Sequence, residues 1–148
     1  MRIVDMTAGD RAIWFNKKQP GVVFLDHRPE VEPTFVVDIR KMPLADDNFN
    51  LVVFDPPHAN FGKNGNMTKN YGHYTAKQIK ELIREGAKEA HRISRRDALM
   101  AFKWNNHDHK LESVLKLMPQ WEPLFGHVVS ARKATRASTT YWVMLRRK

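Results

Sequence analysis

The chain has 148 residues, enough for one domain with a buried core and too few for a second domain. Hydrophobic residues make up 42% of the sequence and charged residues 28%, a balance typical of folded rather than disordered proteins. The absence of cysteine excludes disulfide bonds, thiolate catalysis and cysteine-ligated metal sites.

The formal net charge of +9 is unevenly distributed along the chain. Residues 1–74 hold nine Lys/Arg and nine Asp/Glu, whereas residues 75–148 hold sixteen and seven. A basic region of this kind is typical of proteins that bind a polyanion, most often nucleic acid. A basic protein without such a partner is the alternative.

The beginning of the chain mixes charged and apolar residues and does not match the pattern of a signal peptide. No apolar stretch reaches the length of a membrane span. We therefore expect a single domain over residues 1–148, located in the cytoplasm, with no membrane partner.

Four short apolar runs in the first half predict buried strands, and each run ends in an aspartate. The runs cover residues 2–5, 22–26, 35–38 and 51–55. Their β-branched composition favours the parallel strands of an α/β sheet. If the strands are parallel, the four carboxylates lie along one edge of the sheet, where α/β folds bind ligands.

A glycine-containing turn and a helix are expected between the first two strands. Residues 6–10 read Met-Thr-Ala-Gly-Asp, and residues 11–18 are compatible with a helix that Pro20 and Gly21 end. A strand, a turn and a helix in this order predict the beginning of a βαβ unit.

The fourth run ends in Asp55, Pro56 and Pro57, followed by His58. Proline fixes its own φ angle and cannot donate to a strand ladder. We therefore expect the Asp55 carboxylate and the Pro56 carbonyl to be held rigidly at the carboxyl end of the strand. The alternative is an aspartate that merely closes a strand before a turn.

Residues 59–74 contain three glycines and four asparagines, which predicts a long flexible loop that covers the site or contacts substrate. A surface loop without a binding role is the alternative. Aromatic and basic residues alternate in this loop and suit base stacking and phosphate contact, namely Phe61, Lys63, Lys69, Tyr71 and Tyr74.

The second half predicts two helices and a fifth strand. A capping box at residues 75–78, followed by apolar residues at helical spacing, predicts an amphipathic helix that ends near Arg96. A strand over residues 97–104 and a helix over residues 111–117 follow.

The C-terminal segment, residues 121–148, predicts a β-hairpin with strands at residues 124–129 and 139–145. The connection is too short for a crossover helix, so the two strands should be antiparallel. This connection is basic, and its candidate nucleic-acid contacts are Arg132, Lys133 and Arg136.

With a glycine turn after the first strand, Asp-Pro-Pro after the fourth and a closing hairpin, the chain resembles the class I S-adenosylmethionine-dependent methyltransferases. It is most similar to the subset that methylates amino groups, whose motif is Asp, Asn or Ser, two prolines and an aromatic residue. The resemblance implies S-adenosyl-L-methionine as cofactor. It also implies an α/β, Rossmann-like seven-stranded sheet, mostly parallel with a C-terminal antiparallel hairpin, and helices on both faces.

The resemblance assigns cofactor contacts to the ends of the first three strands. Asp26 matches the acid that holds the ribose hydroxyls, and Asp38 with Ile39 matches the adenine-binding position. The residues that match the first motif of the family, beside the methionine end of the cofactor, are Asp5, Thr7, Ala8 and Gly9. Arg11 follows where the family usually has a second glycine.

The implied catalytic residues are Asp55, Pro56, Pro57 and His58. Because the lone pair of an amino group conjugated to a ring is delocalised, acceptors at its hydrogens would stabilise the positive charge that develops during methyl transfer. His58 replaces the aromatic residue that stacks on the base in this subset. Imidazole can also stack, more weakly. No metal is expected, since the cofactor's sulfonium needs none.

The sequence therefore predicts an N-methyltransferase for the exocyclic amino group of a DNA or RNA base, with adenine N6 favoured. The short chain favours a small or accessible substrate, a single-stranded nucleic acid, or a homodimer that shares recognition. Two alternatives remain: an enzyme for protein glutamine or a small amine, and a non-catalytic module that binds nucleic acid or a protein partner.

Overall fold

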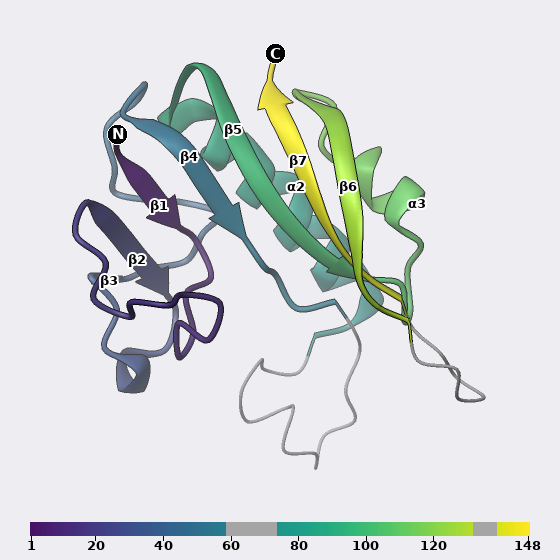
Figure 1. Ribbon diagram of the computed structural model, residues 1–148, viewed down its shortest axis with the longest axis horizontal. Coiled ribbons are helices and arrows are strands. Elements are labelled where there is room, and N and C mark those ends of the chain that lie inside the picture. The colour runs from purple at the N-terminus through teal and green to yellow at the C-terminus, as the bar shows by residue number, and fades with distance from the viewer. Residues whose placement is uncertain (59–73, 132–138) are drawn as a thin grey trace.

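A computed structural model describes residues 1–58, 74–131 and 139–148 of the chain. These residues form a seven-stranded sheet in the order β3-β2-β1-β4-β5-β7-β6 (Figure 1). The strands are β1 (Ile3–Asp5), β2 (Val22–Asp26), β3 (Phe35–Val36), β4 (Phe49–Phe54), β5 (Ser94–Asn105), β6 (Trp121–Ala131) and β7 (Thr139–Arg147). The helices are α2 (Ala76–Ile93), α3 (Leu111–Leu115) and the 3-10 helix η1 (Pro29–Val31).

The first five strands of this order are parallel, as predicted. Their carboxyl ends therefore point to one edge of the sheet (Figure 1). Asp5 and Asp26 are the last residues of β1 and β2, Asp38 lies two residues beyond β3, and Asp55 directly follows β4. The prediction of four carboxylates along one edge is confirmed.

The C-terminal hairpin is also confirmed. β7 pairs antiparallel with both β5 and β6, which makes β6 the edge strand of the described sheet. Both hairpin strands are longer than predicted. β3 is shorter, since its ladder with β2 covers two residues only, and both of them are exposed.

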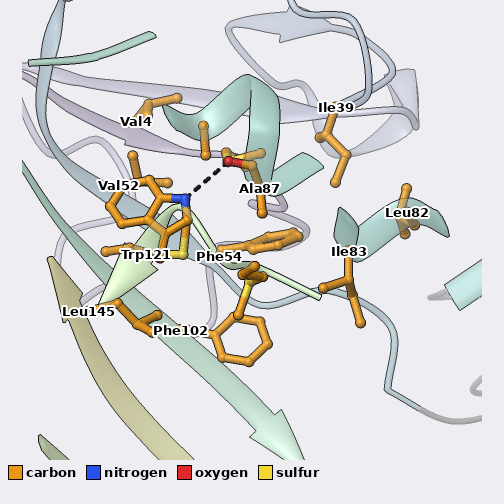
Figure 2. Close-up of a cluster of buried hydrophobic side chains, with 14 of the residues drawn as sticks. Val4, Ile39, Val52, Phe54, Leu82, Ile83, Ala87, Phe102, Trp121 and Leu145 are labelled. Atoms are coloured by element: carbon orange, nitrogen blue, oxygen red, sulfur yellow. Dashed lines mark hydrogen bonds between the residues drawn. The ribbon is translucent and has the colours of Figure 1, made fainter. Parts of the chain in front are cut away.

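Helix α2 begins at the predicted capping box, where Thr75 and Gln78 bond reciprocally. It ends at Ile93, three residues before the predicted end, because the chain passes directly into β5. The buried side of α2 packs against Phe54, Phe102 and other core residues of the sheet. The Trp121 ring lies in this core, where its indole nitrogen donates to the Ala87 carbonyl at 3.0 Å (Figure 2).

The expectation of helices on both faces of the sheet is wrong for the described residues. Helices α2 and α3 lie behind the sheet in Figure 1, and Val114 of α3 belongs to the same core cluster as α2. Over the described chain, the connections among β1, β2, β3 and β4 contain turns and the single-turn η1 instead of α-helices.

The predicted helix at residues 11–18 is likewise absent, and turns occupy this segment. Arg11 has a φ of 55°, which interrupts an α-helix at its first residue. Trp14 turns inward, donates to Asp5 at 2.7 Å and meets the Phe24 ring edge-on. The segment thus covers the end of the helix-free face over β1 and β2. None of the helices described here has the length and apolarity needed to span a membrane.

Candidate functional site

Asp55 lies directly after β4, and its side chain is 15% exposed. Its amide donates to the Thr7 hydroxyl at 2.8 Å, which ties the strand end to the turn after β1. Carboxylate oxygen Oδ2 accepts from the Lys103 ammonium at 2.7 Å. Oxygen Oδ1 is buried and has no hydrogen-bond partner within the described residues. A buried acceptor without a partner is costly, so Oδ1 is suited to receive a donor from a ligand.

Lys103 was not predicted as a site residue. It lies in β5, whose residues 98–102 are all apolar, and its side chain is 25% exposed. One signal in the sequence could have identified it. Lys103 is a lone charged residue near the carboxyl end of an apolar strand, and this strand comes after the one that ends in Asp-Pro-Pro. Only the β4–β5 register places its ammonium on Asp55.

The His58 ring is mostly buried beside Asp55. Its Nδ1 lies 3.9 Å from Asp55 Oδ1, and its ring meets Trp104 nearly edge-on, at 5.6 Å and 74°. Burial lowers the pKa of His58, and the neighbouring Lys103 adds to this, whereas Asp55 and the Pro56 carbonyl oppose it. With its pKa below the ordinary value of 6.5, His58 is neutral at pH 7. A neutral imidazole beside a carboxylate can donate one hydrogen bond and accept another.

Asp5 is buried, at 1% exposure, and organises the turn that follows β1. One carboxylate oxygen accepts from the Thr7 amide at 3.1 Å and the other from Trp14 at 2.7 Å. Burial raises the pKa of Asp5 from 3.8 to about 6, although these hydrogen bonds oppose the shift. Asp5 therefore supports the turn from inside, in addition to any contact with a ligand.

This shifted pKa predicts a stability that depends on pH. Between about pH 4 and pH 6 the folded protein retains a proton that the unfolded chain has released, so stability falls as the pH rises through this window. In the variant Asp5→Asn this fall should be smaller, by up to about 3 kcal/mol. Chemical unfolding of both proteins from pH 4 to pH 7 measures the difference, and parallel stability curves would contradict the assignment.

Gly9 adopts a left-handed conformation, with φ +50°, where the turn after β1 contacts the end of β2. Its amide donates to Asp26 Oδ2 at 2.9 Å. A Cβ atom at this position would lie 3.3 Å from the Arg28 guanidinium and would require an unfavourable φ. The backbone conformation and the nearby Arg28 therefore favour glycine at this position, whether or not a ligand binds there.

Two of the edge carboxylates are paired with arginines two residues further along the chain. Asp26 accepts from the Arg28 side chain at 3.1 Å and from the Arg28 amide at 2.9 Å. Asp38 accepts from the Arg40 side chain at 2.6 Å. Burial raises the pKa of Asp26, but the hydrogen bonds from Arg28 and Gly9 outweigh it and keep that pKa low. A ligand that binds Asp26 must therefore share it with Arg28.

Two cavities meet at Asp55. The larger, about 240 Å³, extends over the ends of β2 and β3, where Asp26, Asp38 and Ile39 line it. The smaller, about 110 Å³, lies at the turn after β1, and Asp5, Ala8 and Lys103 line it. Both cavities are also lined by a shared set of residues, namely Thr7, Gly9, Arg28 and Asp55.

The structure thus brings most of the predicted cofactor and catalytic residues to one place. Pro57 and Tyr74 line the larger cavity, and Pro56 is buried between Asp55 and Pro57. The roles assigned to these residues stay predictions. The other predicted substrate residues lie outside the described residues, namely Phe61, Lys63, Lys69, Tyr71, Arg132, Lys133 and Arg136.

Solved structures share this fold over nearly the whole chain. A SAM-dependent methyltransferase from Methanosarcina mazei has a TM-score of 0.69 and 11% identity, with 99% of this chain and 92% of that chain covered. The N-methyltransferase NodS from Bradyrhizobium japonicum, in complex with S-adenosyl-L-homocysteine, has a TM-score of 0.67 and 12% identity, with 99% and 77% covered. The [4+2]-cyclase SpnF has a TM-score of 0.66 and 11% identity, with 99% and 74% covered.

These likenesses show that the chain has the fold of the class I SAM-dependent methyltransferases, as the sequence predicted. At such low identity they show the fold alone, and the cyclase illustrates that one fold serves more than one reaction. No protein-family model and no curated protein matches the sequence.

Proposed function

We propose that this protein is an S-adenosylmethionine-dependent N-methyltransferase whose target is an exocyclic amino group. One observation carries the proposal: Asp55 lines both cavities, and one of its carboxylate oxygens is buried without a partner in the described chain. An acceptor in this position is what an amino group needs while its nitrogen gains positive charge.

The residues around Asp55 fit the proposed cofactor. The larger cavity has carboxylates for the ribose and adenine groups, Asp26 and Asp38, and an apolar residue, Ile39. The smaller cavity has Asp5 for an ammonium group, and Gly9 allows close approach of its backbone. S-adenosyl-L-methionine, when bound, supplies an electrophilic methyl group on its sulfonium.

The chain's own residues bind and orient the amino group. Lys103 occupies Asp55 Oδ2, so Oδ1 is the carboxylate oxygen left without a donor in the described chain and the one we assign to an N–H of the target. The Thr7 hydroxyl holds the Asp55 amide, and two prolines follow it, so the carboxylate has little freedom to turn. Fixed placement of reacting groups can account for a large part of a rate enhancement.

Among amino-group substrates we propose a base of a nucleic acid, with adenine N6 favoured. The basic second half of the chain and the resemblance to the Asp-Pro-Pro subset support this choice. His58 is neutral and lies beside Asp55, so its ring could bond to a ring nitrogen next to the amino group or stack on the base.

Calorimetric titration with S-adenosylmethionine tests the enzymatic proposal first. Binding is expected, and its absence would leave a non-catalytic module on a methyltransferase fold. Incubation with labelled cofactor and a panel of DNA, RNA and protein, followed by identification of the modified unit, then tests the substrate. Labelling of a protein glutamine in place of a base would reject the nucleic acid as substrate, as would activity that does not decline with salt.

A further inference from the structure

Within the described chain, one face of the sheet carries no helix over β5, β7 and β6. Phe102 and Val143 point into the core beneath α2, so their neighbours Lys103 and Trp142 point to the opposite face. Figure 1 shows α2 behind these strands and α3 beside β6, and no described helix lies in front of them.

Aromatic side chains gather on this face beside the candidate site. Trp142 lies directly opposite Lys103 on β5 and opposite His127 on β6, so the three side chains form one row. Phe125 lies in the next row, opposite Met144, and is 69% exposed. We call Phe125, His127 and Trp142 the aromatic shelf.

The aromatic shelf is continuous with Asp55 through one side chain. The Lys103 ammonium lies 2.7 Å from Asp55 Oδ2 and 6.0 Å from the centre of the Trp142 ring. A group that rests on Trp142 is therefore separated by the Lys103 side chain alone from the carboxylate proposed to receive the target amino group.

We propose that the aromatic shelf binds the bases of a single-stranded nucleic acid and leads the strand to Asp55. That the strand is led to Asp55 rests on the proposed function. The aromatic shelf itself is defined only by strand register and side-chain exposure. Aromatic rings on an open sheet face suit the stacking of unpaired bases, whereas the bases of a duplex already stack on one another.

Charge favours this occupant over the alternatives. The chain has a formal net charge of +9, which attracts a polyanion to the molecule as a whole. On the face itself, the Glu122 carboxylate is neutralised by Arg146 at 2.6 Å. A second copy of the same basic chain would be repelled.

Fluorescence anisotropy with a labelled, mixed-sequence single-stranded DNA tests the aromatic shelf in the full chain. Trp142→Leu and Phe125→Leu keep an apolar side chain and remove the stacking ring. Each should weaken binding by about 5- to 150-fold, the range for loss of one stacking aromatic residue. The dependence of binding on salt should stay unchanged, since no phosphate contact is removed.

Phe35→Leu is the matched control, because Phe35 is 46% exposed on the opposite edge strand, and its affinity should equal that of the wild type. Calorimetry with S-adenosylhomocysteine should show the same affinity in all variants, which separates loss of the shelf from unfolding. Wild-type affinity in both shelf variants, equal affinity for duplex DNA, or a dimer that Phe125→Leu dissociates would overturn the inference. If the shelf variants weaken DNA binding but the wild type does not bind S-adenosylhomocysteine, the proposed function is rejected and the aromatic shelf is still supported as a DNA-binding surface.

Discussion

Replacing Asp55 with alanine is expected to lower the rate of methyl transfer by about 10²- to 10³-fold, the usual loss when one group that stabilises a developing charge is removed. The buried Oδ1 is the acceptor that the target amino group would lose. Affinity for S-adenosylmethionine should remain nearly unchanged, because most of the cavity over β2 and β3 is lined by other residues. Single-turnover transfer and calorimetry measure the two quantities.

Two further variants show whether this loss is chemical. Asp55→Asn keeps the shape but presents an uncharged side chain beside Lys103, so it should also impair transfer. Asp47→Ala removes an exposed carboxylate that pairs with Arg147 at 3.1 Å, and its activity should equal that of the wild type. If Asp55→Ala loses cofactor binding together with activity, Asp55 is a structural residue and the proposed role is wrong.

Replacing Trp121 with alanine is expected to lower the free energy of unfolding by about 3–5 kcal/mol, the range for deletion of a large buried aromatic side chain. Trp121 is 2% exposed and lies in the core cluster with residues of both α2 and the sheet. The substitution removes this packing and the indole hydrogen bond to the Ala87 carbonyl (Figure 2). Urea unfolding followed by circular dichroism measures the change.

Trp121→Phe separates the two contributions, since it keeps most of the packing and loses the hydrogen bond. It should cost about 1 kcal/mol plus the small loss of volume. Phe15→Ala is the control, because Phe15 is fully exposed and its removal should leave stability unchanged. A loss below about 1 kcal/mol for Trp121→Ala would show that this part of the core is not tightly packed.

Local patterns predicted the elements whose contacts are close in sequence or strongly periodic. The capping box at Thr75 and Gln78 marks the start of α2, and the short connection between β6 and β7 requires an antiparallel pair. The segment at residues 11–18 shows the limit of such patterns. Its composition allows a helix, but Trp14 gains a buried hydrogen bond to Asp5 and a contact with Phe24 by turning inward. Tertiary contacts outweigh a weak helical propensity.

In the candidate site, too, local sequence predicted some features and tertiary contacts decided the others. The run from Leu51 to Pro57 predicted by itself an acid held at the end of a buried strand, because apolar composition and proline geometry act locally. The partners of that acid depend on register. Lys103 reaches Asp55 only because β5 pairs with β4 in one alignment, and a shift of one residue would turn it into the core. Which oxygen stays free, and which face of the sheet stays open, are decided by packing between segments distant in sequence.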